Sequence, residues 1–157
     1  MTQTYYSNGK LLITGEYVVL NGATALALPT KFGQSLTIEP NKINGLNWSS
    51  FDADGSCWFE TFIVFDEIKN KIKTTDNAIK NTLIEILHEA FQLNPSYLED
   101  VDGYNISTRL TFPKKWGLGT SSTLINNIAN WLSVDPYTLL KNSFGGSGYD
   151  LACAQND

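Results

Sequence analysis

The residues best suited to chemistry lie in residues 113–123, which read Pro-Lys-Lys-Trp-Gly-Leu-Gly-Thr-Ser-Ser-Thr. Gly117 and Gly119 would let backbone N–H groups approach an anion without interference from a Cβ atom. The hydroxyl residues 120–123 follow directly and open a run with helical periodicity. The unpaired amides in the first turn of that helix would face the same anion. The stretch therefore predicts a phosphate-binding loop.

A purely structural interpretation of this stretch stays open. Gly-Leu-Gly can be a tight turn, with Thr120 or Ser121 as an ordinary helix N-cap. The common nucleotide-binding pattern Gly-x-x-x-x-Gly-Lys-Ser/Thr does not occur in the chain. Every charged side chain in residues 103–134 is basic, which favours a bound anion. Lys114 and Lys115 could equally be solubilising residues of an exposed loop.

The loop needs one element before it and one after it. Residues 104–110 alternate between apolar and polar side chains and predict a half-buried strand, with Ile106, Thr108 and Leu110 on one face. After the loop, apolar residues repeat at helical spacing and predict an amphipathic helix. These residues are Leu124, Ile125, Ile128, Ala129 and Leu132.

The N-terminal part of the chain predicts strands. Short apolar runs at residues 11–13, 17–20 and 23–28 alternate with breaks, and we expect Pro29 to end the third run. Asn21-Gly22 predicts a tight turn, and residues 34–39 alternate again. Residues 41–65 predict one or two more strands, with aromatic side chains that we expect in the core and, alternatively, in a purine pocket. These are Trp48, Phe51, Trp58, Phe59 and Phe62.

Two further helices are predicted. Residues 76–92 carry an apolar stripe with Asp76 as the expected N-cap. The single histidine, His88, lies off this stripe, so we expect it to face solvent rather than to act as a catalytic base. Asp135 followed by proline predicts the start of a short helix that runs through Lys141.

The composition predicts one globular domain. The chain has 157 residues, of which 42% are hydrophobic and 12% aromatic. Its net charge of −5 argues against a nucleic-acid partner. The apolar runs fall short of the roughly 20 residues that span a bilayer, so we expect no membrane association. Cys57 and Cys153 predict reduced thiols and a cytoplasmic protein.

Three segments, in this order and spacing, resemble motifs of the GHMP kinase superfamily. Residues 9–17, Gly-Lys-Leu-Leu-Ile-Thr-Gly-Glu-Tyr, resemble the opening motif, with Asn8 where the family has proline. Residues 113–123 resemble its phosphate loop, Pro-x-x-x-Gly-Leu-Gly-Ser-Ser-Ala-Ala. Residues 147–150, Ser-Gly-Tyr-Asp, resemble a segment of mevalonate kinase-like members. The longer Gly-Tyr-Asp-Leu-Ala is similar to a subgroup with a Gly-Tyr-Asp-Ile-Ala signature.

The resemblance implies an α+β fold like that of ribosomal protein S5 domain 2, with a mixed sheet packed against helices. This is the fold of the N-terminal half of GHMP kinases. We therefore expect residues 1–157 to form the ATP-binding domain of such a kinase. Family members are longer and add a ferredoxin-like C-terminal domain that closes over the acceptor.

The resemblance also implies a function and a set of site residues. The function is Mg²⁺-dependent transfer of the ATP γ-phosphoryl group to a hydroxyl of a small acceptor, with mevalonate or a related isoprenoid precursor as first choice. Asp150 would take the proton of the acceptor hydroxyl, Lys10 would stabilise the transferring group, and Ser121 would ligate Mg²⁺. The implied nucleotide-binding residues are Gly117, Leu118, Gly119, Thr120, Ser121 and Ser122. The implied substrate residues are Glu16, Tyr17 and Ser147.

Other interpretations remain for these residues. Lys10 can be a surface strand residue, Glu16 a turn carboxylate and Asp150 a helix cap. The second magnesium carboxylate of mevalonate kinases has no counterpart in residues 136–149, and Asp135 fits a helix cap better. A non-catalytic nucleotide-binding or interaction module is thus the alternative function. A homodimer also stays open.

Overall fold

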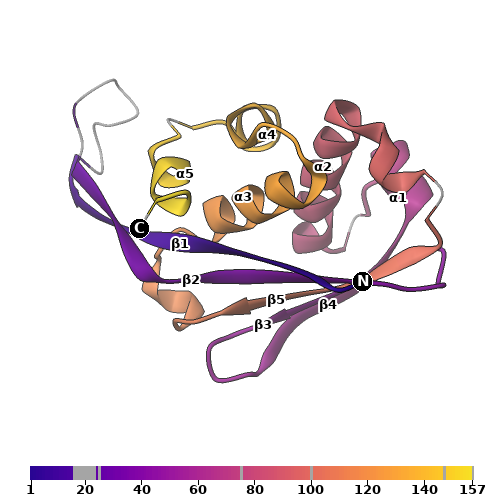
Figure 1. The fold of residues 1–157 in the computed structure, drawn as a ribbon, viewed down its shortest axis with the longest axis horizontal. Helices are drawn as coiled ribbons and strands as arrows, with labels where there is room; N and C mark the ends of the chain where they lie inside the picture. Colours follow the sequence, from indigo (N-terminus) through magenta and orange to yellow (C-terminus); the bar gives the residue numbers. More distant parts are fainter. Residues whose placement is uncertain (16–23, 25, 75, 100, 147, 157) are drawn as a thin grey trace.

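The computed structural model describes residues 1–15, 24, 26–74, 76–99, 101–146 and 148–156. Within these residues, a five-stranded sheet has the strand order β1-β2-β5-β3-β4 (Figure 1). The strands are β1 (Gln3–Thr14), β2 (Leu26–Pro40), β3 (Gly45–Phe51), β4 (Cys57–Val64) and β5 (Gly103–Leu110). The β3 and β5 strands are parallel and the other neighbours are antiparallel. The predicted mixed sheet is confirmed.

The α-helices of the described chain lie on one face of this sheet (Figure 1). They are α1 (Phe65–Lys69), α2 (Ala78–Leu93), α3 (Thr120–Leu132), α4 (Pro136–Ser143) and α5 (Tyr149–Ala154). Two short 3-10 turns, η2 (Pro95–Leu98) and η3 (Lys114–Trp116), complete the fold. One core joins the two layers, and it includes Leu36, Trp48, Ile106, Ile84, Leu87 and Ile128. None of the described helices is long and apolar enough to cross a membrane.

The strand predictions were mostly confirmed. The β5 strand buries Ile106, Thr108 and Leu110 as predicted, and residues 41–65 contain the two strands β3 and β4. The expected break at Pro29 was wrong, because β2 continues through it. Pro29 lies opposite a residue of β1, whereas pairing with β5 begins only at Gln34. In the described sheet, β5 does not extend along β2 as far as Pro29. The backbone N–H that proline lacks is therefore not needed for pairing on that side of β2.

The predicted helices are present, but some of their ends differ from the predicted positions. Asn77, not Asp76, is the N-cap of α2, because its side chain accepts a hydrogen bond from Lys80 N. The predicted start of α4 was confirmed, since the Asp135 carboxylate accepts a hydrogen bond from Thr138 N. The α1 helix was not predicted. The strand predicted at residues 17–20 and the turn predicted at residues 21–22 lie outside the described residues.

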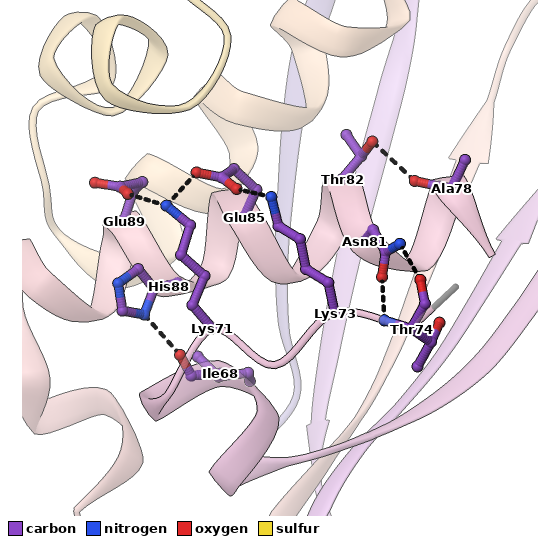
Figure 2. A network of polar contacts seen from close by, with 10 residues as sticks. All are labelled: Ile68, Lys71, Lys73, Thr74, Ala78, Asn81, Thr82, Glu85, His88 and Glu89. Atoms are coloured by element: carbon purple, nitrogen blue, oxygen red, sulfur yellow. Dashed lines mark hydrogen bonds and ion pairs between the residues drawn. The ribbon is translucent and has the colours of Figure 1, made fainter. Parts of the chain in front are cut away.

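The connection from α1 to α2 is fixed to α2 by polar side chains (Figure 2). Lys71 forms ion pairs with Glu85 and Glu89, and Lys73 pairs with Glu85. His88 Nδ1 lies 2.8 Å from the carbonyl oxygen of Ile68. A carbonyl can only accept, so Nδ1 carries the hydrogen. His88 is thus partly buried and hydrogen-bonded, and the expectation that it simply faces solvent was wrong.

Candidate functional site

The glycine-rich loop ends in an open helix start. Gly117 and Gly119 have left-handed φ values of +69° and +83°, and α3 begins at Thr120. Gly119 is the N-cap, and no side chain caps the helix, so the interpretation of Thr120 or Ser121 as N-cap was wrong. Within the described residues, the backbone N–H groups of residues 120–122 donate to no protein acceptor. The first turn of α3 therefore presents free donors and the positive end of its dipole.

The loop packs directly on β1. The backbone N–H of Lys10 donates to the carbonyl oxygen of Leu118 at 2.9 Å. A Cβ atom at Gly119 would lie 3.1 Å from Cγ of Lys10. The absence of a side chain at Gly119 thus makes room for the Lys10 side chain to cross the loop. This close approach brings the opening motif and the phosphate-loop motif together.

The Lys10 ammonium meets two neighbouring side chains at the start of α5. It lies 3.3 Å from Asp150 Oδ1, and the side chains of Lys10 and Asp150 are 16% and 27% exposed. It donates a hydrogen bond to the Tyr149 hydroxyl at 3.2 Å. Asp150 Oδ1 is buried and accepts no well-aligned hydrogen bond from the described residues. The Lys10 contact is therefore an ion pair rather than a well-aligned hydrogen bond.

The charges at this site shift two pKa values. Burial alone would lower the pKa of Lys10, but the Tyr149 hydroxyl and the Asp150 carboxylate outweigh it and raise that pKa above its usual value. Burial raises the pKa of the Cys153 thiol, the Asp150 carboxylate raises it further, and Lys10 opposes both. Lys10 is therefore a cation at neutral pH, and Cys153 is a protonated thiol.

The second glycine-rich turn places Asp150 in the first turn of α5. Gly148 is the N-cap of this helix, so the interpretation of Asp150 as a helix cap was wrong. Ser121, the predicted magnesium ligand, is exposed in the first turn of α3. The predicted substrate residues Glu16, Tyr17 and Ser147 lie outside the described residues.

A buried polar network beneath the loop was missed by sequence reasoning. Ser7 Oγ donates to Asn127 Oδ1 at 2.8 Å and accepts from Asn126 Nδ2 at 2.9 Å. Asn127 Nδ2 donates to Gln34 O at 2.9 Å, and Thr123 Oγ1 donates to Gln34 Oε1 at 2.9 Å. All five side chains are buried. The network joins β1, β2 and α3 directly behind the open helix start.

A cavity of about 240 Å³ adjoins the same helix start. Its walls include Thr120 and Ser121 of α3, aliphatic side chains of α2 and Trp58 of β4. Trp58 Nε1 is buried and has no hydrogen-bond partner among the described residues. The Lys114 ammonium lies 3.5 Å from the centroid of the Trp58 ring. Trp48 and Phe59 are core residues as predicted and also line this cavity, and Trp58 packs against that core. Phe62 is exposed, so its predicted core position was wrong.

Comparisons of the sequence with protein-family models and with curated proteins give no match. Comparison of the fold with solved structures gives strong matches. The Methanococcus jannaschii mevalonate kinase matches with a TM-score of 0.70 at 16% identity, over 98% of this chain and 51% of that protein. The chain has the GHMP kinase fold. Lactococcus lactis galactokinase, in complex with galactose, matches with a TM-score of 0.62 at 13% identity, over 93% of this chain and 39% of that one.

The GHMP kinase fold does not by itself fix the reaction. A mevalonate diphosphate decarboxylase from Legionella pneumophila also matches, with a TM-score of 0.53 at 15% identity over 96% of this chain and 49% of that one. The chain spans about half the length of the solved mevalonate kinase that it matches. At these identities the matches show the fold of the chain alone.

Proposed function

We propose that residues 1–157 are the ATP-binding domain of a kinase that transfers the γ-phosphoryl group of ATP to a hydroxyl of a small acceptor. One observation carries this proposal. Three segments that are far apart in the sequence contribute an ammonium, a carboxylate and an uncapped helix start to one place. Phosphoryl transfer depends on positioning and on charge stabilisation, and these groups provide both.

The role of each group follows from its chemistry. The free amides of residues 120–122 and the positive end of the α3 dipole would bind the ATP phosphates. The Lys10 ammonium would stabilise negative charge on the transferring phosphoryl group. Asp150, whose side chain is 27% exposed, would accept the proton of the acceptor hydroxyl.

The residues present fit a magnesium ion bound mainly through phosphate. The described residues contain no group of three His, Cys, Asp or Glu side chains that could hold a metal ion alone. Mg²⁺ in kinases usually combines one or two protein ligands with substrate phosphates. Ser121 would be such a ligand, and Asp150 lies within the same site. When bound, Mg²⁺ would neutralise charge on the phosphates.

The cavity beside Thr120 is our candidate for the nucleotide base. Its wall combines the Trp58 ring with Ile79, Leu83 and Ile86, which suits a flat heteroaromatic ring. A base here would leave its phosphates next to the open first turn of α3. Trp58 fluorescence should therefore change when MgATP binds, and a Trp58→Phe variant should lose that change.

The acceptor is proposed from the motifs, and a mevalonate-type acid is the first to test. The experiment measures ADP release by the full-length natural protein with MgATP and each of mevalonate, phosphomevalonate, galactose and homoserine. We expect release that depends on mevalonate or phosphomevalonate. Turnover of galactose or homoserine alone would overturn the acceptor assignment. MgATP binding without turnover of any acceptor would instead support the non-catalytic nucleotide-binding module.

A further inference from the structure

Two side-chain amides attach the end of α5 to the other parts of the site. Gln155, the C-cap of α5, donates from Nε2 to Asn126 Oδ1 of α3 at 3.2 Å. Asn8 of β1 donates from Nδ2 to the carbonyl oxygen of Asn156 at 2.9 Å. Asn8 stands two positions before Lys10 on the same strand. The helix that carries Asp150 is therefore bonded to both elements that carry the remaining site groups.

The Gln155 contact ends in the buried network rather than on the surface. Asn126 uses its oxygen for Gln155 and its nitrogen for Ser7, and Ser7 donates onward to Asn127. Each amide oxygen accepts and each amide nitrogen donates, so the orientation of every member is set by its neighbours. A change at Gln155 would leave the buried Asn126 oxygen without a donor, which carries a desolvation cost.

These contacts matter because α5 is too short to be stable as a helix without contacts to the rest of the protein. It has six residues, fewer than an isolated helix needs. Its buried side chains, Leu151, Cys153 and Ala154, attach it by non-directional apolar contacts. Directional contacts are what fix the rotation and translation of such a helix. Apart from the Lys10 contacts with Tyr149 and Asp150, the side-chain hydrogen bonds that join the described parts of α3 and β1 to the end of α5 involve Asn126 and Asn8.

We propose that Gln155, Asn126 and Asn8 are positioning residues. They hold α5 so that the Asp150 carboxylate stays against Lys10 and beside the open first turn of α3. None of the three has to touch a substrate for this role. The inference rests on the proposed function for the role of Asp150. The placement of α5 itself can be tested without nucleotide.

The free thiols of the chain provide that test. Cys153 is buried on α5, whereas Cys57 is exposed on β4 and serves as a reference in the same molecule. The experiment measures the rate of labelling of each thiol by the uncharged reagent N-ethylmaleimide, resolved by peptide mass spectrometry. In Gln155→Met, which removes the donor and keeps a side chain of similar length, we expect the ratio of the Cys153 rate to the Cys57 rate to rise about five- to tenfold. Asn8→Ala should raise it to a similar degree.

The matched control is Asn94→Ala. Asn94 Nδ2 donates to the carbonyl oxygen of Leu132 at 2.7 Å, an amide-to-carbonyl bond at the opposite end of α3. We expect the labelling ratio to stay within about twofold of the unchanged protein in this variant, because the lost bond joins Asn94 to the end of α3 and does not involve α5. A ratio that rises equally in Asn94→Ala, or that stays unchanged in Gln155→Met, would overturn the proposal.

A second readout separates positioning from general loss of structure. In Gln155→Met we expect the dissociation constant for MgATP to stay within about twofold while the rate of phosphoryl transfer falls about tenfold. A parallel loss of MgATP affinity would contradict a positioning role. If the unchanged protein transfers no phosphoryl group, the proposed function fails. The labelling ratio then still decides whether these residues hold α5.

Discussion

The Lys10 ammonium lies 3.3 Å from the Asp150 carboxylate, although one residue belongs to the first strand and the other to the last helix of the described chain. The two meet because Gly119 lacks a side chain where Lys10 crosses the loop. The ion pair therefore depends on a third segment, between them in the sequence. A substitution in any one of the three segments should therefore have its own measurable effect.

Lys10→Met should remove the charge and keep most of the side-chain length. The Lys10 ammonium pairs with Asp150, and the Lys10 side chain passes Gly119 at the uncapped helix start. We expect the rate of phosphoryl transfer to fall about a hundredfold or more, because one stabilising group for transition-state charge is lost. The control is Lys42→Met, an exposed lysine in the turn between β2 and β3. Equal rates in the two variants would exclude a role for Lys10.

Asp150→Asn should separate binding from chemistry. The amide has the shape of the carboxylate but cannot take a proton from an alcohol at neutral pH. We expect phosphoryl transfer to be abolished and the dissociation constant for MgATP to stay nearly unchanged. Transfer can be followed with a coupled ADP assay, and binding by calorimetry. An unchanged transfer rate would remove Asp150 from the mechanism.

Gly117→Ala and Gly119→Ala form a matched pair in one loop. Both glycines are left-handed, so either alanine should lower the free energy of unfolding by about 1 kcal/mol. A Cβ atom at Gly117 would meet nothing within 4 Å, whereas one at Gly119 would lie 3.1 Å from Lys10 Cγ. Only Gly119→Ala should therefore also displace Lys10 and slow phosphoryl transfer. Urea unfolding measures the first effect, and equal transfer rates in both variants would contradict the second.

The sequence was sufficient to single out the three segments that the fold brings together, because their motifs are short and local. Left-handed glycines before a helix can be expected from residues 117–120 alone. The order of the three motifs along the chain, with Lys10 in the first and Asp150 in the last, indicated the fold. The buried Asn126 and Asn127 could not be expected. Helical periodicity identifies one apolar face, but α3 packs against β1, β2, α4 and α5 at once. A helix that is surrounded buries polar side chains too, and only the tertiary arrangement shows this.

Pro29 illustrates the same limit for strands. Proline usually ends or interrupts a strand because it cannot donate to a neighbour. Whether a neighbour is present at Pro29 depends on how far β5 extends along β2, and that pairing begins only at Gln34. Strand length was therefore decided by contacts between segments far apart in the sequence, which local patterns do not contain.

The ion-pair cluster on α2 should make stability depend on pH (Figure 2). Burial alone would raise the pKa of Glu85, but hydrogen bonds from Lys71 and Lys73 outweigh it and hold that pKa below 4.5. A carboxyl group whose pKa is lowered by folding stabilises the folded state at pH values above its unfolded-state pKa. This stabilisation is lost as the pH falls through its folded-state pKa. Hydrogen bonds from Lys71 to Glu85 and Glu89 raise the Lys71 pKa above 10.5, so its contribution is lost only as pH rises beyond that.

Glu85→Gln should therefore lower the free energy of unfolding by about 0.5 to 1 kcal/mol at neutral pH, the range for partly exposed pairs. The difference from the unchanged protein should shrink towards zero at an acid pH below the lowered folded-state pKa of Glu85, where the carboxyl is protonated in both states. Urea unfolding at the two pH values measures it. Glu99→Gln is the control, because Glu99 is exposed and forms no ion pair within the described residues, so it should show almost no difference at either pH. A Glu85→Gln difference of equal size at both pH values would mean that packing, and not charge, fixes the α1–α2 connection.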